Sequence, residues 1–517
     1  MDRHPNRWPL LAVLCLSVLL VTVDNTIVNV ALPTLSRELD ASTSSLQWIV
    51  DAYTLVFAGL LLVAGYLGDR FGRRRFLSAG LVAFGVTSAL SALASTSGQL
   101  IAGRAAMGAA AALIYPATLG LLTNLFTDAR ERAAAIGIWA GVSGLAVAIG
   151  PVSGGVLLEH FSWNSVFLVN VPFVVLALLA GRWLPESRDD APGRFDGLGA
   201  LGSVAAIGLL VWTVIEAPNH GWTSGTTLAG FALSVAAVAG FITHQARRTD
   251  PLLDVRLFRN ARFSAGSGAI TAAFFGLFGF IFMVTQYFQA VRGYDTLKAG
   301  LATLPFALVV GVMSPVAIVL MHRLGSTRVV ATGLASMSGG FLLAATTGLE
   351  SAYWGRIVAS MLLMAVGLAL TAGPATDAIM GALPAAKAGV GSAVNDTTRE
   401  VGGTLGVAVV GSTMSSVFGS HVADALHALG APAAAVDTAR ESIIAGLQVA
   451  GSISPQAVDG VRVAFMDGFR TGSWVSAGLT AVAALAVLVF LPARHREEAT
   501  AEPEPADVVP DPLTPAR

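Results

Sequence analysis

Charged residues are scarce in this chain: Asp, Glu, Lys and Arg make up 12% of its 517 residues, whereas hydrophobic residues make up 54%. Soluble domains carry about a quarter charged residues. This deficit, together with a mean hydropathy of +0.70, excludes an ordinary soluble protein and predicts a polytopic membrane protein. The formal net charge of −1 carries no information about partners, and nothing in the sequence suggests nucleic acid as one of them.

Cysteine and lysine are also nearly absent. A single cysteine, Cys15, excludes an intramolecular disulfide and argues against a cysteine metal cluster, so we expect neither a metal nor a cofactor. Neither of the two lysines, Lys298 and Lys387, follows a P-loop glycine, which excludes an ATP-driven pump made of this chain alone. The sequence has no H-E-x-x-H motif and no evident nucleophile–base pair, so an enzyme is not expected.

Long apolar runs are what the chain has in abundance. A spanning helix needs about 20 mostly apolar residues, and Pro, Gly and charge clusters mark the breaks between such runs. By this rule the sequence predicts an all-α protein with fourteen membrane spans, at 9–32, 46–67, 76–95, 99–122, 133–157, 164–184, 196–216, 227–245, 262–289, 298–321, 328–348, 354–380, 391–418 and 471–491.

The distribution of arginine and lysine predicts the orientation. With the N-terminus inside the cell, cytoplasmic segments hold 22 of these residues and the opposite side holds seven. Short loops rich in Lys and Arg resist translocation, so we expect both termini in the cytoplasm and the chain in a bacterial plasma membrane.

A faint internal repeat divides the chain, because Met321–Gly325 echoes Gly68–Gly72. We expect two six-helix bundles with two inserted helices between them, and a monomer that contacts the lipid bilayer. The predicted regions are an N-terminal bundle at 1–190, inserted helices at 191–250, a C-terminal bundle at 251–492 and a disordered cytoplasmic tail at 493–517. Within the second bundle, 419–468 should form short amphipathic helices on the outer membrane surface.

Three ionisable residues fall inside predicted spans of the first bundle. Ionisable groups in the hydrocarbon region are expensive and are therefore functional candidates. Asp24 lies about 12 Å from the outer end of its span, and Asp51 and Arg104 lie about 9 Å from theirs. We therefore expect all three in one layer, with the two aspartates binding protons and Arg104 tuning their affinity. The alternative is a structural ion pair that only fixes helix packing.

A second polar layer is predicted near the cytoplasmic end of the other bundle. Asp377 ends one predicted helix, and Asn395, Asp396, Arg399 and Glu400 open the next. Spacings of three and four residues let Arg399 meet Asn395 and Asp396 on one face. A gating role and a self-paired helix start are both open.

Several segments resemble the fourteen-helix drug:proton antiporter family of the major facilitator transporters. These are Val23–Pro33, the loop G-x-L-G-D-R-x-G-R-R-R beginning at Gly65, Arg104–Gly108, the segment Gly150–Gly155, and Gly391–Asn395 with Arg399 and Gly402-Gly403. The fourth, with Gly150, Pro151, Gly154 and Gly155, is similar to the motif of antiporters rather than symporters. Its small residues also suit close helix packing.

The resemblance implies proton-driven export of bulky, hydrophobic or cationic small molecules, including antibiotics, by alternating access. It further implies a cytoplasmic latch in which Asp69, Arg70 and Arg73 meet the predicted helix start that carries Asp396, Arg399 and Glu400. The segment Lys298–Met321 departs from relatives that export divalent organic cations, because it holds no acidic residue. This departure argues against doubly charged substrates.

Aromatic and amide side chains are candidates for lining a substrate cavity: Trp48, Tyr53, Gln286, Tyr287 and Gln289. Core or lipid-facing positions are the alternative for such residues. The main alternative for the whole chain is a proton symporter or a facilitator for a metabolite or for the producer's own natural product.

Overall fold

The computed structural model describes residues 7–126, 128–188, 196–249, 251, 253–382 and 388–491, with some positions of α2, α5 and α15 described by backbone alone. Helices account for nearly all of this part of the chain, and it contains no strand. The expected all-α architecture is therefore confirmed.

Seven helices form the first unit, here called the N-half: α1 (Arg7–Glu38), α2 (Thr43–Phe71), α3 (Arg73–Ser91), α4 (Ser97–Leu125), α5 (Ala129–His160), α6 (Ser165–Leu168) and α7 (Asn170–Gly181). The inserted hairpin follows, with α8 (Gly197–His220) and α9 (Gly225–Arg247).

The second unit, the C-half, begins with the short helix η1 (Val255–Arg259) and α10 (Ala261–Gln286). It continues with η2 (Tyr287–Val291), α11 (Thr296–Leu301), α12 (Leu304–Leu324), α13 (Ser326–Ala345), η3 (Tyr353–Ile357), α14 (Val358–Met380), α15 (Ala388–Ala428), α16 (Ala433–Glu441), α17 (Ile443–Ile453) and α18 (Pro455–Phe490).

Local sequence explains where many of these helices begin. A Ser, Thr, Asp or Asn side chain at the N-cap accepts a hydrogen bond from an otherwise unpaired N–H of the first turn. Such caps start α2, α4, α8, α9, α10, α11, α17 and α18, and their residues are Ser42, Thr96, Asp196, Ser224, Asn260, Asp295, Ser442 and Ser454.

Eleven helical segments of the described chain are long and apolar enough to cross a membrane. The expected spans that fall outside this set correspond to α3, α5 and the pair α6–α7. The first turn of α3 carries three arginines, several positions of α5 are described by backbone alone, and α6 and α7 are separated at Val169. The chain is thus a multi-pass membrane protein, while the count of fourteen spans stays a prediction.

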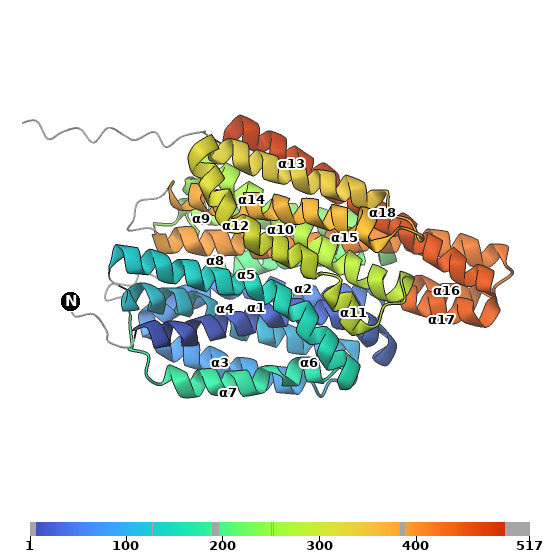
Figure 1. Ribbon diagram of the computed structural model, residues 1–517, viewed down its shortest axis with the longest axis horizontal. Coiled ribbons are helices and arrows are strands. Elements are labelled where there is room, and N and C mark those ends of the chain that lie inside the picture. Colours follow the sequence, from blue (N-terminus) through green and yellow to red (C-terminus); the bar gives the residue numbers. More distant parts are fainter. Residues whose placement is uncertain are drawn as a thin grey trace, which may run out of the picture.

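One expected boundary is wrong. The sequence predicts that a span ends at 418 and that the last one starts at 471, with separate short helices between them. Instead α15 continues to Ala428 and α18 already begins at Pro455. Both long helices project beyond the rest of the bundle and are joined there by α16 and α17 (Figure 1). We call this the α16–α17 end, and the opposite end, where α1 starts and α18 finishes, the terminal end.

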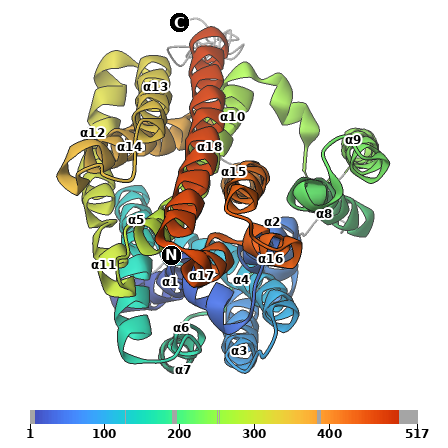
Figure 2. The ribbon, with the colours of Figure 1, turned by 90° about the vertical axis from the view of Figure 1, so that its right-hand side faces the viewer.

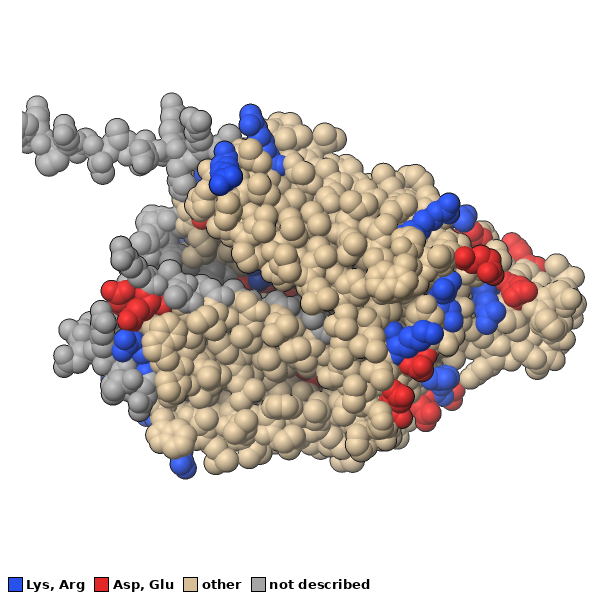
Figure 3. Space-filling view, in the orientation of Figure 1, with Lys and Arg blue, Asp and Glu red and all other residues tan. Residues whose placement is uncertain are grey.

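The two halves lie one above the other in Figure 1, and the inserted hairpin stands at one side, with α8 against both α2 and α15 (Figure 2). On the face shown in Figure 3, the surface along the helices carries almost no charge, and the charged side chains gather at the two ends. This distribution is the one that a bilayer requires, because charged groups are stable only outside the hydrocarbon layer.

Glycines set the closest helix contacts in each half. A Cβ on Gly108 of α4 would lie 2.3 Å from the backbone oxygen of Tyr53 in α2. In the C-half, a Cβ on Gly406 of α15 would lie 2.3 Å from the backbone oxygen of Phe275 in α10. Only glycine permits such approaches, so these positions fix how α2 presents its polar residues to α4, and α10 to α15.

Candidate functional site

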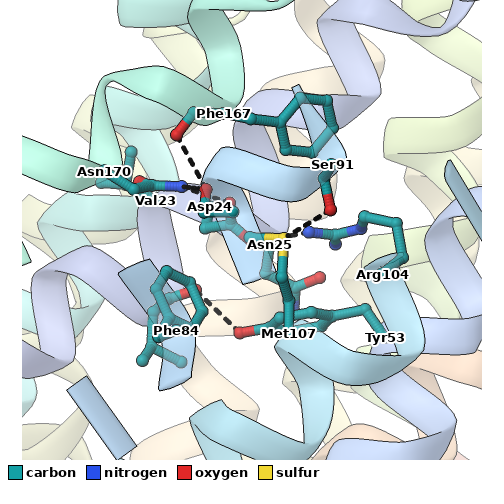
Figure 4. Close-up of polar contacts among 12 residues, drawn as sticks. Val23, Asp24, Asn25, Tyr53, Phe84, Ser91, Arg104, Met107, Phe167 and Asn170 are labelled. Atoms are coloured by element: carbon teal, nitrogen blue, oxygen red, sulfur yellow. Dashed lines mark hydrogen bonds and ion pairs between the residues drawn. The ribbon is translucent and has the colours of Figure 1, made fainter. Parts of the chain in front are cut away.

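Asp24 and Arg104 form an ion pair inside the N-half (Figure 4). Arg104 Nη1 lies 2.6 Å from Asp24 Oδ2, and both side chains are fully buried. Arg104 Nε also donates to the backbone carbonyl of Ile49 at 3.1 Å. A buried charge is tolerated only beside its counter-charge, so α1, α2 and α4 are held together by a pair whose two members depend on each other.

Two neutral residues complete the surroundings of Asp24. Asn170 Nδ2 donates to Asp24 Oδ1 at 2.7 Å and to Ser88 Oγ at 3.0 Å. Ser88 Oγ in turn donates to the backbone carbonyl of Phe167 at 2.7 Å. The sequence analysis missed both residues, because an uncharged side chain in an apolar helix gives little signal. The position of Asn170 at the start of α7, inside an apolar run, is the one sign that could have drawn attention to it.

The guanidinium of Arg104 has one face on an aromatic ring and one nitrogen without a partner. Its Cζ lies 4.2 Å from the centroid of the Tyr53 ring, and the Tyr53 hydroxyl bonds to the backbone carbonyl of Val21 at 3.4 Å. Arg104 Nη2 is buried and makes no hydrogen bond. Arg104 Nη2 is therefore a free donor, which could form a new hydrogen bond when the protonation state of Asp24 changes.

Asp51 does not join this pair, and its place in one layer with Asp24 and Arg104 stays a prediction. Ile49 and Tyr53 lie on the side of α2 that contacts Arg104, whereas Gln47 and Thr54 face α15. Helical spacing puts Asp51 with Gln47 and Thr54. Asp51 is fully buried, and neither of its carboxylate oxygens has a hydrogen-bond partner.

A second cluster of charges lies in the C-half. Because α15 begins at Ala388, Glu400 lies about 18 Å along the helix, beyond its first turns. Arg399 forms no ion pair with Asp396 or Glu400. Its Nη2 donates to Thr376 Oγ1 at 3.3 Å, and its Cζ lies 5.2 Å from the centroid of the Phe274 ring.

Several polar atoms of this cluster have no partner. Asp396 accepts a bond of 3.3 Å from Asn395 Nδ2, but Glu400 Oε2, Arg399 Nε and Thr397 Oγ1 are buried without one. Glu400 lies one helical turn from Thr404, which bonds to Thr54 of α2 at 2.8 Å, so this face of α15 is turned toward the N-half. The cluster therefore faces the N-half site and has unused hydrogen-bonding capacity.

The predicted latch stays a prediction, because the side chain of Asp69 lies outside the described residues. The loop after α2 turns at Gly72, where φ is +114° and a Cβ would meet the Glu186 carboxylate at 2.8 Å. Glu186 accepts a bond from the backbone N–H of Arg74 at 3.0 Å, and Arg73 donates to the Ser187 hydroxyl at 3.3 Å. The loop is thus tied within the N-half, and no bond recorded for Arg399 joins it to the loop.

For the other latch residues, Arg70 donates to the Tyr66 hydroxyl at 3.3 Å, and the side chain of Asp69 lies outside the described residues. Asp377, expected beside the cluster, instead lies 3.6 Å from Arg262 of α10.

The segment Gly150–Gly155 lies where α5 contacts both halves. A Cβ on Gly150 would clash with the Thr26 side chain of α1, and one on Gly155 would lie 2.7 Å from the backbone of Leu297 in α11. From the other side, a Cβ on Gly300 would lie 2.4 Å from the carbonyl oxygen of Pro151. These contacts make the α5–α11 interface one of the places where the halves touch closely.

The five candidate cavity residues do not form one pocket. Trp48 Nε1 bonds to Glu216 of α8 at 3.3 Å, and Tyr53 lies at the Arg104 site. Gln289 donates to the Val30 carbonyl at 2.9 Å, and Tyr287 packs on Phe469. Gln286 lines a small cavity with Thr43, Phe282, Met414, Ser415, Phe418, Ile443 and Phe465.

With this geometry described, comparison with known proteins identifies the class. The family model of the Major Facilitator Superfamily matches residues 14–407, so the chain belongs to this superfamily. The bacterial homologue of the human lysosomal transporter Spinster, in an inward-facing, occupied conformation, has the same fold, with a TM-score of 0.66 and 16% identity, covering 95% of this chain and 98% of that one.

Two curated relatives are similar over almost their whole length. The multidrug efflux pump LfrA of Mycolicibacterium smegmatis is 37% identical, covering 94% of this chain and 96% of that protein. The tetracenomycin C resistance and export protein of Streptomyces glaucescens is 34% identical, covering 96% and 94%. These relatives support an exporter of the superfamily, a membrane transporter of small molecules rather than an enzyme.

Proposed function

We propose that the protein is a proton-coupled antiporter of the fourteen-helix drug-exporting type. It would move bulky hydrophobic or cationic molecules out of the cell by alternating access. The observation that carries this proposal is the fully buried Asp24–Arg104 pair. Burying an ionisable acid in the membrane interior costs free energy, so residues of this kind usually have a function. The names of the relatives support the export direction.

In this proposal the proton exchanges with the ion pair. While Asp24 is ionised, Arg104 Nη1 and Asn170 Nδ2 hold its two oxygens. A proton on Asp24 cancels the charge that holds Arg104 and frees the guanidinium to turn toward its unused contacts. The two protonation states therefore favour different arrangements of α1, α2 and α4, and a substrate that favours one of them is coupled to the proton.

The charge balance of the C-half cluster supports cationic cargo. Asp396 and Glu400 outnumber Arg399, whose guanidinium is engaged with Thr376 and Phe274. A bulky monovalent organic cation entering between the halves would find the unpaired Glu400 Oε2 together with an aromatic ring, two groups that favour such cations. The latch role expected for these residues stays a separate prediction.

Orientation follows from the arginine distribution, so we propose that the terminal end is cytoplasmic and the α16–α17 end faces outward. Recorded hydrogen bonds between the halves lie toward the α16–α17 end. Ser36 pairs with Ser442, and Thr43 donates to the Glu441 carbonyl. This is the arrangement of a transporter closed to the outside, and both halves belong to one chain, which supports a monomeric unit.

Transport into vesicles tests the coupling. Purified protein in liposomes should accumulate ethidium, a planar aromatic cation, when the lumen is made acidic, because protons leaving the vesicle drive the exchange. Empty liposomes under the same gradient are the control for passive entry. Accumulation only when the outside is acidic would identify a symporter, and equal entry without any gradient would identify a facilitator; either result would reject antiport.

A further inference from the structure

Asp51 is the most isolated acid in the described part of the membrane region. Its side chain is fully buried, and neither oxygen has a partner. It lies on the face of α2 that forms what we call the α2–α15 seam. There, Gln47 Nε2 donates to the Ala408 carbonyl and to Ser412 Oγ, both at 3.1 Å, and Thr404 bonds to Thr54 at 2.8 Å. These bonds lie one turn before and one turn after Asp51.

The inserted hairpin closes the remaining side of this seam. Helix α8 runs along α2: Trp48 bonds to Glu216, and a Cβ on Gly59 would lie 2.4 Å from Val204. Val211 and Ile215 of α8 are fully buried and form an apolar cluster with Ala408 of α15, against which Trp48 packs. Asp51 is therefore enclosed by three helices, and the third is one that a twelve-helix transporter lacks.

The charged groups around Asp51 all lie away from its carboxyl. On α4, Arg104 bonds to Asp24 and to the opposite side of α2. On α8, Glu216 is held at the level of Trp48, near the α16–α17 end. On α15, Glu400 lies one turn beyond Thr404 toward the terminal end, followed by Arg399 and Asp396. No described cation forms an ion pair with Asp51.

An ionised carboxylate in such a dry site costs several kcal/mol, so a buried acid without a counter-charge takes up a proton instead. The Gln47 side-chain oxygen, one helical turn away on the same face, is also buried without a donor. A proton on Asp51 would supply the donor that this oxygen lacks. The closed seam therefore favours the protonated, neutral form of Asp51 over the ionised form.

We propose that Asp51 binds a proton that locks the α2–α15 seam, with Gln47 as the positioning residue that links the acid to α15. The proton is taken up from the side onto which the seam opens, and it is distinct from the one exchanged at Asp24. Opening admits water and lets the carboxyl ionise, so low pH on that side favours the closed seam and high pH favours the open one. That this side is the outside rests on the orientation given under the proposed function.

Cysteine labelling tests the lock without measuring transport. In a Cys15→Ser background, Ala408→Cys places a thiol in the seam, where the native residue is fully buried. A membrane-impermeant methanethiosulfonate is applied from outside to intact cells at pH 5.5 and pH 8. Because thiol reactivity itself rises with pH, each result is compared with that of the Asp51→Asn variant, which carries a permanently neutral side chain.

We expect the parent to label at pH 8 about tenfold faster than Asp51→Asn, equivalent to about 1.4 kcal/mol of differential proton binding between the two seam states. At pH 5.5 the two should label at similar, slow rates. Gln47→Met, which keeps the length but removes the amide, should label fast at both pH values, and Asp51→Glu should restore the parent's pH response. Insertion of each variant is checked by size-exclusion chromatography.

Asp24→Asn separates this proposal from the proposed function, because it should abolish coupled transport while leaving the pH response of labelling intact. Identical labelling of the parent and Asp51→Asn at both pH values would overturn the lock. A response that disappears in Asp24→Asn but persists in Asp51→Asn would overturn it as well, by moving the sensor to the ion pair.

Discussion

The N-half and the C-half each bury charges near the middle of the membrane, but they treat them differently. In the N-half, both oxygens of Asp24 are bonded, to Arg104 at 2.6 Å and to Asn170 at 2.7 Å. In the C-half, Glu400 Oε2 and Arg399 Nε are buried with no partner. Burying a polar group without a hydrogen bond costs about 1–3 kcal/mol. The Glu400 carboxylate therefore bears a cost that the Asp24 carboxylate avoids.

This difference indicates two tasks. A satisfied pair is a stable resting state that only a proton can disturb, because a neutral partner cannot replace the guanidinium. A carboxylate oxygen without a hydrogen-bond partner, next to an aromatic ring, is instead suited to binding a transported molecule that supplies the missing contact. We infer that the energy source acts on the N-half and the cargo on the C-half, and that the Thr54–Thr404 bond links α2 to α15 between them.

The largest expected effect comes from breaking the satisfied pair. Asp24→Asn removes the titratable group, so gradient-driven ethidium transport should fall to the level of empty liposomes. The variant also leaves Arg104 buried without its counter-ion, which is destabilising by about 3–5 kcal/mol, and its melting temperature in detergent should drop.

The double variant Asp24→Asn, Arg104→Gln is the matched control for that prediction. It removes both charges, so it should recover much of the lost thermal stability while remaining inactive in transport. If Asp24→Asn retained gradient-driven transport, the proton site would have to be elsewhere.

A smaller and more selective effect is expected from the C-half. Glu400→Gln removes one of the two acids that outnumber Arg399, and the concentration of ethidium giving half-maximal transport should rise about tenfold, equivalent to about 1.4 kcal/mol. Transport of a neutral aromatic substrate should change little, because it makes no use of the carboxylate. Equal losses for both substrates would mean that Glu400 acts on the transport cycle rather than on cation binding.

The sequence predicted part of these two sites well. Charges inside apolar runs are rare enough that Asp24 and Arg104 could be identified and placed at matching depth, and the structure brings them into contact. Asp51 has the same signal at nearly the same depth. The sequence did not show which helices Asp51 faces, because this direction depends on the rotation of α2 against α4 and α15, which hydrophobicity alone does not fix.

Other errors have a similar physical origin. The sequence placed the start of this helix at 391, three residues after the observed start of α15 at Ala388, because helix boundaries are the weakest part of any sequence-based prediction. Asn170 and Glu186 were missed since each gains its role from partners far away in the chain: Asp24 for one, and the Gly72 turn for the other.

A buried acid outside both halves, Asp196, sharpens the comparison and gives the smallest effect. Asp196 caps α8 and accepts hydrogen bonds from the Gly199 N–H at 2.9 Å and from His244 and Gln245 of α9 at 3.0 Å. Burial alone would raise the pKa of Asp196, but the hydrogen bonds from His244, Gly199 and Gln245 outweigh it and lower the pKa below its ordinary value. Asp196 resembles Asp24 in being fully satisfied, yet it lies at the terminal end, away from both clusters.

An acid whose oxygens are all hydrogen-bonded should take part in transport only if it can exchange protons between the halves. Asp196 lies away from that region, so Asp196→Asn should lower the stability of the protein and leave proton coupling intact. We expect a loss of about 1–2 kcal/mol in unfolding free energy at neutral pH, with ethidium transport within about twofold of the parent.

The stability that Asp196 contributes should depend on pH. A carboxyl group with a lowered pKa stabilises the folded state at pH values above the unfolded-state pKa of about 3.9, and this stabilisation is lost as the pH falls through the folded-state pKa. The difference in melting temperature between the two proteins should therefore be constant from pH 8 to pH 5 and shrink below about pH 4. Loss of proton coupling in this variant would instead give the inserted hairpin a direct part in energy transduction, and the division of labour between the halves would have to include it.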